Sequence, residues 1–402
     1  MIKIVKVKDI GEIVTGNTPP RNKPELYGDY MPFIKATDIS ENEKYTYCPE
    51  ECYSEEGFKK YKSSLIPKGA TCVVTIGSVG KKMTMAYCDC FINQAMNAVI
   101  PNENYDEEYV YYLLKNNLHK LKMLDSGTAS GRENISKSAF SNMELQVITE
   151  KKTQERIGKI LSSFDKFIEN NQKQIKLLEE AAQRLYKEWF VDLRFPEYED
   201  VEIVDGVPKG WRKTIIGEIV KTTSGGTPSR THTEYYNNGT NLWVKTKELE
   251  DGFIFDTEEK ITDDAIKKSS AKIVPKGSIL LAMYGATIGK LGIAAKELTC
   301  NQACCVFIFD EQEWKREFLY CWLITNREYL ISQGKGAAQP NLSQTNIQQF
   351  KIILPDEKLL KRFSNIVSDI LKQKCNLELQ IIKLKEVRDR LLPKLMNEEI
   401  EV

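Results

Sequence analysis

Two glycine-rich turns, each followed by a lysine, are the first candidates for chemistry in this sequence. Gly77-Ser78-Val79-Gly80-Lys81 and Gly285-Ala286-Thr287-Ile288-Gly289-Lys290 resemble a phosphate-binding loop. Both have too few residues between their glycines, and neither has the Ser or Thr after the lysine that would hold Mg²⁺. We therefore interpret them as tight strand-to-strand turns, whose glycines let the backbone approach something closely beside a lysine.

Other catalytic patterns are incomplete. Asn17-Thr18-Pro19-Pro20 is similar to the Asn-Pro-Pro-aromatic loop of amino-methyltransferases, but Thr18 and the following Arg21 break the pattern. The chain has no Gly-x-Gly-x-x-Gly turn and no Gly-x-Ser-x-Gly elbow. Its two histidines, His119 and His232, are not at matching positions in the two halves described below. The sequence thus predicts binding without catalysis.

Cysteine usage and charge narrow the class of protein further. The ten cysteines include Cys48-x3-Cys52 and Cys88-x-Cys90, but no histidine stands at a ligand-like spacing, so we expect free thiols and no metal site. No apolar run is long enough for a membrane span and no secretory signal is evident, so we expect a cytoplasmic protein. The formal net charge of zero argues against a purely electrostatic nucleic-acid coat, although it does not exclude a DNA reader.

The strongest pattern in the chain is an internal duplication. The offset between the copies stays between 206 and 210 residues, so the halves share one fold with small loop insertions. Such a chain is expected to form two similar domains with pseudo-two-fold symmetry. The matching segments are 10–14 with 216–220, 15–19 with 224–228, 66–69 with 274–277, 93–95 with 301–303, and 134–136 with 341–343.

Each half reads as a strand-rich globule followed by a long helix. Residues 70–76 and 278–283 are short apolar runs bounded by glycines, as in buried strands. Residues 107–121 and 314–330 have the spacing and aromatic content of core helices. The intervening segment 192–209 mixes Pro, Gly and acidic residues, which predicts an exposed linker.

The long helices carry two heptad seams. A sustained 3.5-residue period favours a left-handed coiled coil, and the simplest partner for each seam is the other, running antiparallel. Asn171, Lys374 and Arg388 are polar seam positions that either fix the register or lie in frayed, wet parts of the coil. Pro393 is expected to end or kink the second helix. The seams are Ile157, Leu161, Phe164, Ile168, Asn171, Ile175, Leu178, Ala182, Leu185 and Trp189, and Phe363, Val367, Ile370, Lys374, Leu377, Ile381, Leu384, Arg388, Leu391 and Leu395.

These motifs, in this order and twice over, resemble the specificity subunits of type I restriction–modification systems. The resemblance covers the whole chain and lies in Ile-Gly-Glu-Ile-Val followed by Gly-x-Thr-Pro, in residues 33–39 and 66–81, and in the helix ends 182–192 and 390–396. It implies an α+β fold in which two similar target-recognition domains, each a mixed sheet plus helices, are separated by two long antiparallel coiled-coil helices. The expected domains are 1–149 and 211–356, with helices at 150–192 and 357–402 and a linker at 193–210.

The resemblance also implies a function. Each domain would read one half of a bipartite site in double-stranded DNA, and the coiled coil would set the spacing and dock two methyltransferase subunits. Restriction subunits would join for cleavage, and this chain would do no chemistry. S-adenosylmethionine, and the ATP and Mg²⁺ used in restriction, would bind to those partners and not to this chain. No membrane is implied.

Simple geometry agrees with a split site. A seam of about 35 residues spans roughly 50 Å, about one and a half turns of DNA. A good bidentate base contact discriminates by only about 1–3 kcal/mol, so two coupled short half-sites multiply the selectivity. Because the loops differ between the copies, we expect an asymmetric site.

The candidate contacts are loop residues, because loops project from the scaffold and differ between the halves. Residues shared by both copies suit phosphates and unshared ones suit bases, whereas the structural alternative is that shared motifs only shape turns. We favour that alternative for Asn93-Gln94 and Asn301-Gln302. The DNA-binding candidates are Thr18, Arg21, Lys35, Thr37, Ser78, Lys81, Lys82, Ser130, Arg132, Asn134, Thr227, Arg230, Lys245, Lys247, Tyr284, Thr287, Lys290, Lys335, Gln339 and Asn341.

Partner-docking candidates lie at the helix ends: Trp189, Phe190, Leu391 and Leu395. The alternative for the two aromatic residues is that they complete the core at the end of the coil. Two other functions compete with DNA recognition. One is a coiled-coil scaffold or adhesin with two similar heads, whose seams would form parallel homo-oligomers. The other is a stand-alone methyltransferase, which would have to bind S-adenosylmethionine by itself.

Overall fold

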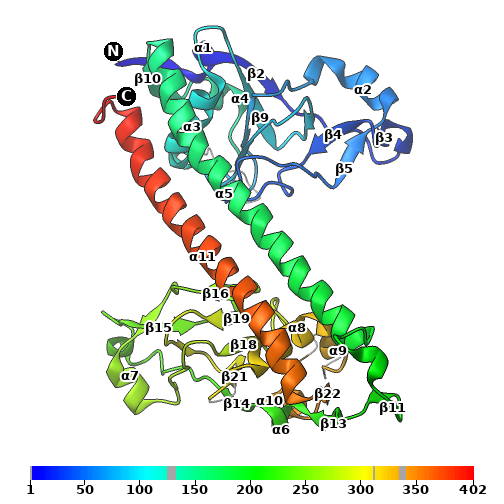
Figure 1. Cartoon of the computed structure of the whole chain (residues 1–402). Helices are drawn as coiled ribbons and strands as arrows, with labels where there is room; N and C mark the ends of the chain where they lie inside the picture. Colours follow the sequence, from blue (N-terminus) through cyan, green and yellow to red (C-terminus); the bar gives the residue numbers. More distant parts are fainter. Residues whose placement is uncertain (1, 125–132, 311–312, 335–340) are drawn as a thin grey trace. The chain divides into compact units, whose positions relative to one another are not determined.

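A computed structural model describes residues 2–124, 133–310, 313–334 and 341–402, and it divides into two compact units (Figure 1). Unit 1 comprises Met1–Glu169 and Lys383–Val402, and unit 2 comprises Asn170–Ile382. The long helices α5 (Lys151–Tyr186) and α11 (Glu357–Met396) contribute residues to both units. The predicted class, two similar α+β domains with two long helices, is confirmed.

Unit 1 contains two four-stranded sheets and a two-stranded one. The first has the order β2-β9-β6-β7 with antiparallel neighbours, and the second has the order β3-β5-β4-β8, in which β4 and β8 are parallel. The strands are β1 (Ile2–Lys6), which pairs with β10 (Glu144–Ile148), β2 (Gly11–Thr15), β3 (Tyr27–Gly28), β4 (Met31–Ile34), β5 (Glu51–Tyr53), β6 (Thr71–Val74), β7 (Met83–Met85), β8 (Phe91–Ile92) and β9 (Met96–Pro101). The helices are α1 (Val7–Ile10), α2 (Glu55–Tyr61), α3 (Glu107–Asn117) and α4 (Lys137–Ser141).

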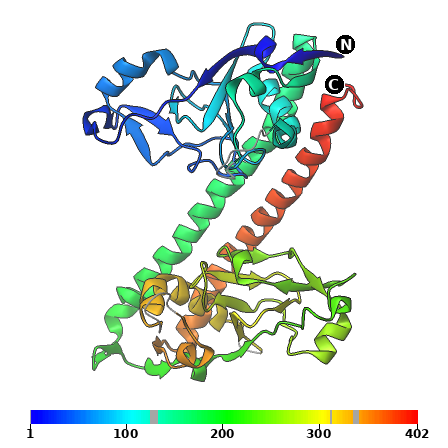
Figure 2. The same cartoon turned by 180° about the vertical axis from the view of Figure 1, so that it is seen from behind.

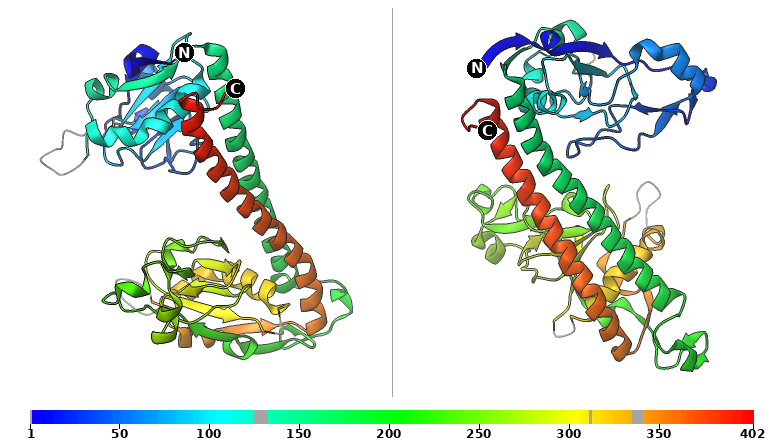
Figure 3. Two further views of the ribbon diagram at one scale, coloured as in Figure 1. Left: turned by 90° about the vertical axis from the view of Figure 1, so that its left-hand side faces the viewer. Right: turned by 45° about the horizontal axis from the view of Figure 1, so that its top comes forward.

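Unit 2 repeats this plan. Figures 2 and 3 show both units from behind and from two further directions. Its main sheet has the order β14-β21-β18-β19 with β16 added at the edge, and β17-β15-β20 form a second sheet. The strands are β13 (Arg212–Ile215), which pairs with β22 (Lys351–Leu354), β14 (Lys221–Ser224), β15 (Asn241–Val244), β16 (Gly252–Ile254), β17 (Lys260–Ile261), β18 (Ile279–Ala282), β19 (Leu291–Ala294), β20 (Thr299–Cys300) and β21 (Cys304–Ile308). The helices are α6 (Ile216–Ile219), α7 (Asp263–Lys268), α8 (Lys315–Thr325), α9 (Arg327–Ser332) and α10 (Gln344–Gln348).

The predicted core elements form where the sequence placed them. Residues 70–76 contain β6 and residues 278–283 contain β18, and every residue of both strands is buried. The predicted helix 107–121 is α3 followed by a 3₁₀ segment, Leu118–Leu124, and Asp106 caps α3 by accepting the Tyr109 amide at 2.9 Å. The predicted helix 314–330 is divided at Asn326 into α8 and α9.

The two seams are confirmed, since none of their twenty positions is exposed. Contacts between α5 and α11 run antiparallel inside each unit. In unit 1, Asp165 meets Arg388, and Arg156 near the start of α5 meets Val402, which follows the end of α11. In unit 2, Asn171 meets Gln380 and Glu179 meets Lys374. This pairing within one chain tells against the scaffold alternative, which required parallel homo-oligomers.

The polar seam positions are buried and bonded rather than frayed. Lys374 is 1% exposed and Arg388 7% exposed, and the Asn171 amide donates to Gln380 at 3.1 Å. Of the two alternatives for these residues, the structure therefore excludes frayed or wet parts of the coil.

Two local expectations hold only in part. Helix α11 passes through Pro393 and ends three residues later at Met396, because the proline lies in the last turn, where few backbone bonds remain to be lost. The linker is not exposed along its whole length. Phe195 and Val207 are only 5% and 7% exposed, and the segment folds into a short hairpin of β11 (Ile203–Val204) and β12 (Val207–Pro208).

Each globule draws on both long helices for its core. The core of unit 2 includes Tyr186 and Trp189 from α5 together with Phe363 and Val367 from α11. The core of unit 1 includes Leu161 from α5 and Leu395 from α11. Removing either helix would therefore expose apolar surface in both globules.

Replacing Arg388 by alanine is expected to destabilise the protein by about 3 kcal/mol, because it leaves the Asp165 carboxylate, 7% exposed, without its cation. The free energy of unfolding in urea measures this loss. Arg390→Ala is the matched control: the Arg390 side chain is 77% exposed and pairs along the same helix with Glu386, at 2.7 Å. That variant should change the free energy by less than about 0.5 kcal/mol. Equal losses in the two variants would contradict the burial argument.

Candidate nucleic-acid interface

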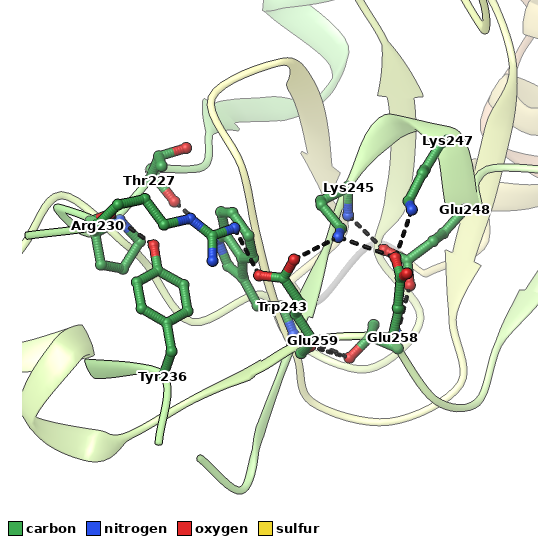
Figure 4. A network of polar contacts seen from close by, with 12 residues as sticks. Thr227, Arg230, Tyr236, Trp243, Lys245, Lys247, Glu248, Glu258 and Glu259 are labelled. Carbon is green, nitrogen blue, oxygen red and sulfur yellow. Dashed lines mark hydrogen bonds and ion pairs between the residues drawn. The ribbon is translucent and has the colours of Figure 1, made fainter. Parts of the chain in front are cut away.

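An arginine and a lysine from two different segments of unit 2 share one glutamate (Figure 4). Arg230 Nη2 lies 2.6 Å from Glu259 Oε2, and Lys245 Nζ lies 2.7 Å from Glu259 Oε1. Lys245 also reaches Glu258 at 3.0 Å, and Lys247 reaches the same carboxylate at 2.5 Å. We call Arg230, Lys245 and Glu259 the arginine–glutamate–lysine network of unit 2.

Unit 1 contains the same network, made of Arg21, Lys35 and Glu51. Arg21 Nη1 lies 2.8 Å from Glu51 Oε1, and Lys35 Nζ lies 3.6 Å from the same oxygen. Lys35 also pairs with Glu50, as Lys245 does with Glu258. Where unit 2 has Lys247, unit 1 has the exposed Thr37. The two units thus share one arrangement of charge but differ beside it.

Strand pairing brings these charges together. Glu51 on β5 stands opposite Phe33 on β4, and Lys35 follows two residues later on the same face. In unit 2 the Trp243 amide donates to the Glu259 carbonyl at 3.3 Å, which puts Lys245 in the equivalent place.

A second set of shared contacts fixes the loop that carries each arginine. The hydroxyl of Thr18 donates to Gln94, and that of Thr227 donates to Gln302. These contacts give the Gln of each Asn-Gln-Ala segment a structural role, as favoured above. Just before each threonine, a Cβ on Gly16 or Gly225 would come within 2.2 or 2.0 Å of a backbone carbonyl oxygen, so only glycine allows the loop to lie this close.

A tyrosine in each unit also holds the loop that carries the arginine. Tyr27 and Tyr236 each donate through the hydroxyl to the carbonyl of the Thr-Pro proline, Pro19 or Pro228, at 2.6 Å. Their rings lie 5.0 and 4.1 Å from the guanidinium carbons of Arg21 and Arg230 respectively, close enough for cation–π attraction. Both arginines are therefore held in place before any ligand arrives.

The carboxylates of Glu51, Glu258 and Glu259 are ionised at neutral pH, because their pKa values are lowered. A hydrogen bond from Arg21 lowers the pKa of Glu51, and one from Lys245 lowers the pKa of Glu259. Hydrogen bonds from Lys247 and Lys245 lower the pKa of Glu258 to about 2. In unit 1, Arg21 and Lys35 face Glu50 and Glu51, and the additional Lys247 gives the ion pairs of unit 2 one positive charge more than those of unit 1.

The arginines are the reachable groups. The side chains of Arg21 and Arg230 are 64% and 55% exposed, while those of Lys35 and Lys245 are 15% and 19% exposed. An incoming anion or base edge would meet the guanidinium groups first, with the lysines beneath them. Guanidinium donors suit both phosphate oxygens and the guanine edge.

The glycine turns connect β6 with β7 and β18 with β19, as the sequence predicted. Gly77 and Gly285 have φ of 94° and 87°, values that favour glycine. In unit 1, Ser78 is half-buried, Lys81 is exposed, and Lys82 Nζ lies 3.5 Å from the carbonyl of Ala36.

In unit 2 the side chains of the turn are mostly engaged within the protein. Tyr284 is half-buried, the hydroxyl of Thr287 donates to the carbonyl of Thr246 at 2.9 Å, and Lys290 pairs with Asp251 at 2.8 Å. Asp251 also holds Arg327.

The remaining candidates are scattered. Asn134 forms a backbone bridge with Ile76 beside the glycine turn, and Asn341 is exposed. Ser130, Arg132, Lys335 and Gln339 lie outside the described residues.

Of the four docking candidates, Trp189 and Leu395 lie in the protein's own cores, and Phe190 and Leu391 are half-buried and pack against those cores. Trp189, at 7% exposed, and Phe190 pack around Phe363, with ring centroids 5.9 and 4.9 Å away, and Leu395 is 2% exposed. Leu391 packs against the core of unit 1. For the two aromatic residues this is the core alternative that the sequence left open.

Glu51 and Glu259 were missed by the sequence reasoning. The signal was present, since Glu50-Glu51 and Glu258-Glu259 repeat at an offset of 208 residues, as do the tyrosines at 209. Basic residues were predicted as contacts because DNA is acidic. The prediction did not include the carboxylates that pair with them.

Within the described ranges, no three His, Cys, Asp or Glu side chains come together in a way that could hold a metal ion. In the same part of the chain, no helix is both long and apolar enough to cross a membrane.

The chain belongs to the family defined by the type I restriction modification DNA specificity domain, whose model matches residues 2–180 and 208–383. It is 29% identical over 99% of its length to the type I restriction enzyme MjaIX specificity subunit of Methanocaldococcus jannaschii, 93% of which is covered. It is 26% identical to the HindI specificity subunit of Haemophilus influenzae, with 76% of this chain and 78% of that subunit covered. Among solved structures it shares its fold with the type I S subunit from M. genitalium, at a TM-score of 0.62, 17% identity, and coverage of 98% and 96% of the two chains.

Replacing Lys247 by threonine, the residue of unit 1, should raise the pKa of Glu258 from about 2 toward its ordinary value. The cause is loss of the strongest hydrogen bond and charge on that carboxylate, and ¹³C NMR titration of glutamate side chains measures it. Above about pH 3 the wild-type carboxylate should not titrate, whereas the variant carboxylate should. Lys267→Thr, on the exposed face of α7, is the control and should leave Glu258 unchanged. An unshifted midpoint in the Lys247 variant would refute the assigned pairing.

Proposed function

We propose that this chain is the DNA-recognition subunit of a type I restriction–modification complex, and that each unit reads one half of a bipartite, asymmetric site. The observation that carries the proposal is the duplicated arginine–glutamate–lysine network with different side chains around it. A shared feature cannot distinguish two half-sites, but it can dock both units on DNA in the same way. The neighbouring differences, such as Thr37 against Lys247, can then distinguish the sequences.

The contacts divide by exposure. We assign Arg21 and Arg230 to phosphate oxygens, because they are shared, exposed and already oriented by a tyrosine and a glutamate. Each glutamate orients its arginine through an exposed ion pair. Such a pair contributes only about 0–1 kcal/mol, so little free energy opposes the arginine when it binds a phosphate. We assign base contacts to unshared residues, among them Lys247, Tyr284 and Ser78.

The remaining parts of the complex are partners. In this proposal two methyltransferase subunits bind S-adenosylmethionine and methylate adenine, and restriction subunits use ATP and Mg²⁺ for cleavage. The specificity chain does no chemistry, and the α5–α11 coil sets the spacing of the half-sites. Because Trp189, Phe190, Leu391 and Leu395 are occupied within the chain, the methyltransferase subunits would dock on the exposed residues around the coil. The complex would act on DNA in the cytoplasm.

The direct test is to express this chain with its methyltransferase subunit in a host without adenine methylation, and to map N6-methyladenine across the genome. A single split motif with a fixed gap and two different halves is the expected result. An active methyltransferase that yields no motif, or a continuous one, would overturn the proposal.

Arg21→Gln and Arg230→Gln should each weaken binding of the complex to its own site on the order of tenfold, and lower the salt slope of log K by about 1, because each removes one phosphate contact. Fluorescence anisotropy at several salt concentrations measures both quantities. The methylated motif should stay the same, and the exposed Arg390→Gln should behave like the wild type. If either arginine variant instead relaxes one base of the motif, that arginine reads a base and our assignment is wrong.

A further inference from the structure

The glycine turn of unit 2, residues 285–290, is held by one residue, Asp251, at the end that carries Lys290. The Lys290 ammonium lies 2.8 Å from Asp251 Oδ2, and the amide of the next residue, Leu291, donates to Asp251 Oδ1 at 3.0 Å. The Asp251 amide in turn donates to the Leu291 carbonyl at 2.8 Å. The same aspartate therefore holds both the charged side chain and the backbone at the end of the turn.

Asp251 has a backbone conformation that side chains rarely adopt. Its φ is 66°, in the left-handed region, where Asp and Asn are among the few residues that occur besides glycine. Such a conformation persists only where the surroundings fix it. Two groups from core helices donate to the Asp251 carbonyl: the hydroxyl of Tyr320 on α8 at 2.9 Å, and the ammonium of Lys374 on α11 at 2.6 Å. The position of Asp251 is thus fixed by α8 and α11.

The Asp251 carboxylate binds two cations at once. Besides the Lys290 ammonium it accepts hydrogen bonds from both Nη atoms of Arg327, one of them at 3.2 Å. Burial by itself would raise the pKa of Asp251, but hydrogen bonds from Lys290 and Leu291 and the charge of Arg327 outweigh it and lower that pKa. The carboxylate is therefore ionised at neutral pH, and the two cations together carry one positive charge more than it does.

This cluster has the chemistry of the arginine–glutamate–lysine networks. One carboxylate again lies between a more exposed and a less exposed cation, since the Lys290 side chain is 45% exposed and that of Arg327 is 25% exposed. The hydroxyl of Thr287 in the same turn donates to the carbonyl of Thr246, which directly follows Lys245 of the network. The turn therefore joins the cluster to the candidate interface of unit 2.

Unit 1 uses the corresponding lysine differently. Lys82 stands 208 residues before Lys290, and its ammonium lies 3.5 Å from the carbonyl of Ala36. Ala36 directly follows the network lysine, as Thr246 does in unit 2. In unit 1 the lysine of the turn therefore makes the link that Thr287 makes in unit 2, whereas Lys290 takes no part in that link.

We propose that Lys290 binds a DNA phosphate in unit 2, and that Asp251 and Arg327 are the positioning residues that hold its ammonium in one place. The counterpart of this contact in unit 1 is used inside the protein, so the two halves of the site are bound unequally. An ammonium suits a phosphate as a point charge, and the partly exposed ion pair leaves this ammonium accessible. The inference rests on the proposed function, because it concerns the same complex with DNA.

The test uses the chain in complex with its methyltransferase subunit, bound to duplexes that carry the methylated motif. One duplex is unmodified, and in each of the others a single phosphate is replaced by an uncharged methylphosphonate. Fluorescence anisotropy gives the affinity for every duplex and the salt slope for the unmodified one. Replacement of a contacted phosphate should weaken binding by the wild type about tenfold.

Lys290→Gln should weaken binding to the unmodified duplex on the order of tenfold and lower the salt slope of log K by about 1. One methylphosphonate that weakens binding by the wild type should no longer weaken binding by this variant, because both changes remove the same contact. Lys209→Gln is the matched control, because Lys209 is 71% exposed and also pairs with a carboxylate, that of Glu202 at 3.0 Å. It should behave like the wild type on every duplex.

Asp251→Asn tests the positioning. Asparagine keeps the left-handed backbone and an oxygen for the Leu291 amide, but it releases Lys290. The salt slope should not fall, since the lysine is still present, whereas the effect of the methylphosphonate identified with Lys290→Gln should drop below about threefold. A purely structural role would lower the melting temperature and leave the phosphate effects as in the wild type, which would overturn the role of Asp251. If Asp251→Asn does not fold, Arg327→Gln makes the same test, because it removes the second cation that holds the carboxylate.

Failure of this inference and failure of the proposed function give different results. A wild-type complex that does not prefer its motif over other DNA would overturn both. In the other case the wild type prefers its motif and Arg230→Gln loses a phosphate contact, but Lys290→Gln behaves like Lys209→Gln. The proposed function then stands, and the phosphate contact of Lys290 is wrong.

Discussion

The structure depends on the packing of both long helices into each globule. Neither core is closed without them, because Leu161 and Leu395 belong to one core and Trp189 and Phe363 to the other. A coiled coil that merely linked two finished domains could be lengthened or exchanged freely. Here the seam residues are also core residues, so the recognition domains and the coil must fold together.

The candidate DNA-binding surface is duplicated together with the fold. The fold is used twice, and so are the arginine, the lysine and the glutamate that holds both. Repetition of the scaffold keeps the mode of docking constant, while single positions such as Thr37 and Lys247 vary without disturbing it. Exposed loops tolerate such changes because hydrogen bonds to the rest of the unit fix their backbone. These bonds come from Tyr27 and Tyr236 and from the contacts of Thr18 and Thr227 with glutamines.

Much of the fold could be predicted because its signals are local or repeated. The seams have a 3.5-residue period, and the buried strands are short apolar runs between glycines. The contribution of Glu51 could not be read in this way, since it depends on β5 pairing with β4 so that Glu51 stands opposite Phe33. Burial of Phe195, Trp189 and Phe190 likewise depends on where α11 and Trp211 lie, which no local pattern reveals.

The measurement that tests the central claim most directly is the methylation motif of a chain in which residues 211–356 are replaced by a second copy of residues 1–149. If each globule reads one half-site and the coil alone sets the gap, the motif should become symmetric. Its first half should then appear twice, once on each strand, at an unchanged spacing. An active complex whose motif kept its original second half, or changed in both halves, would contradict the account.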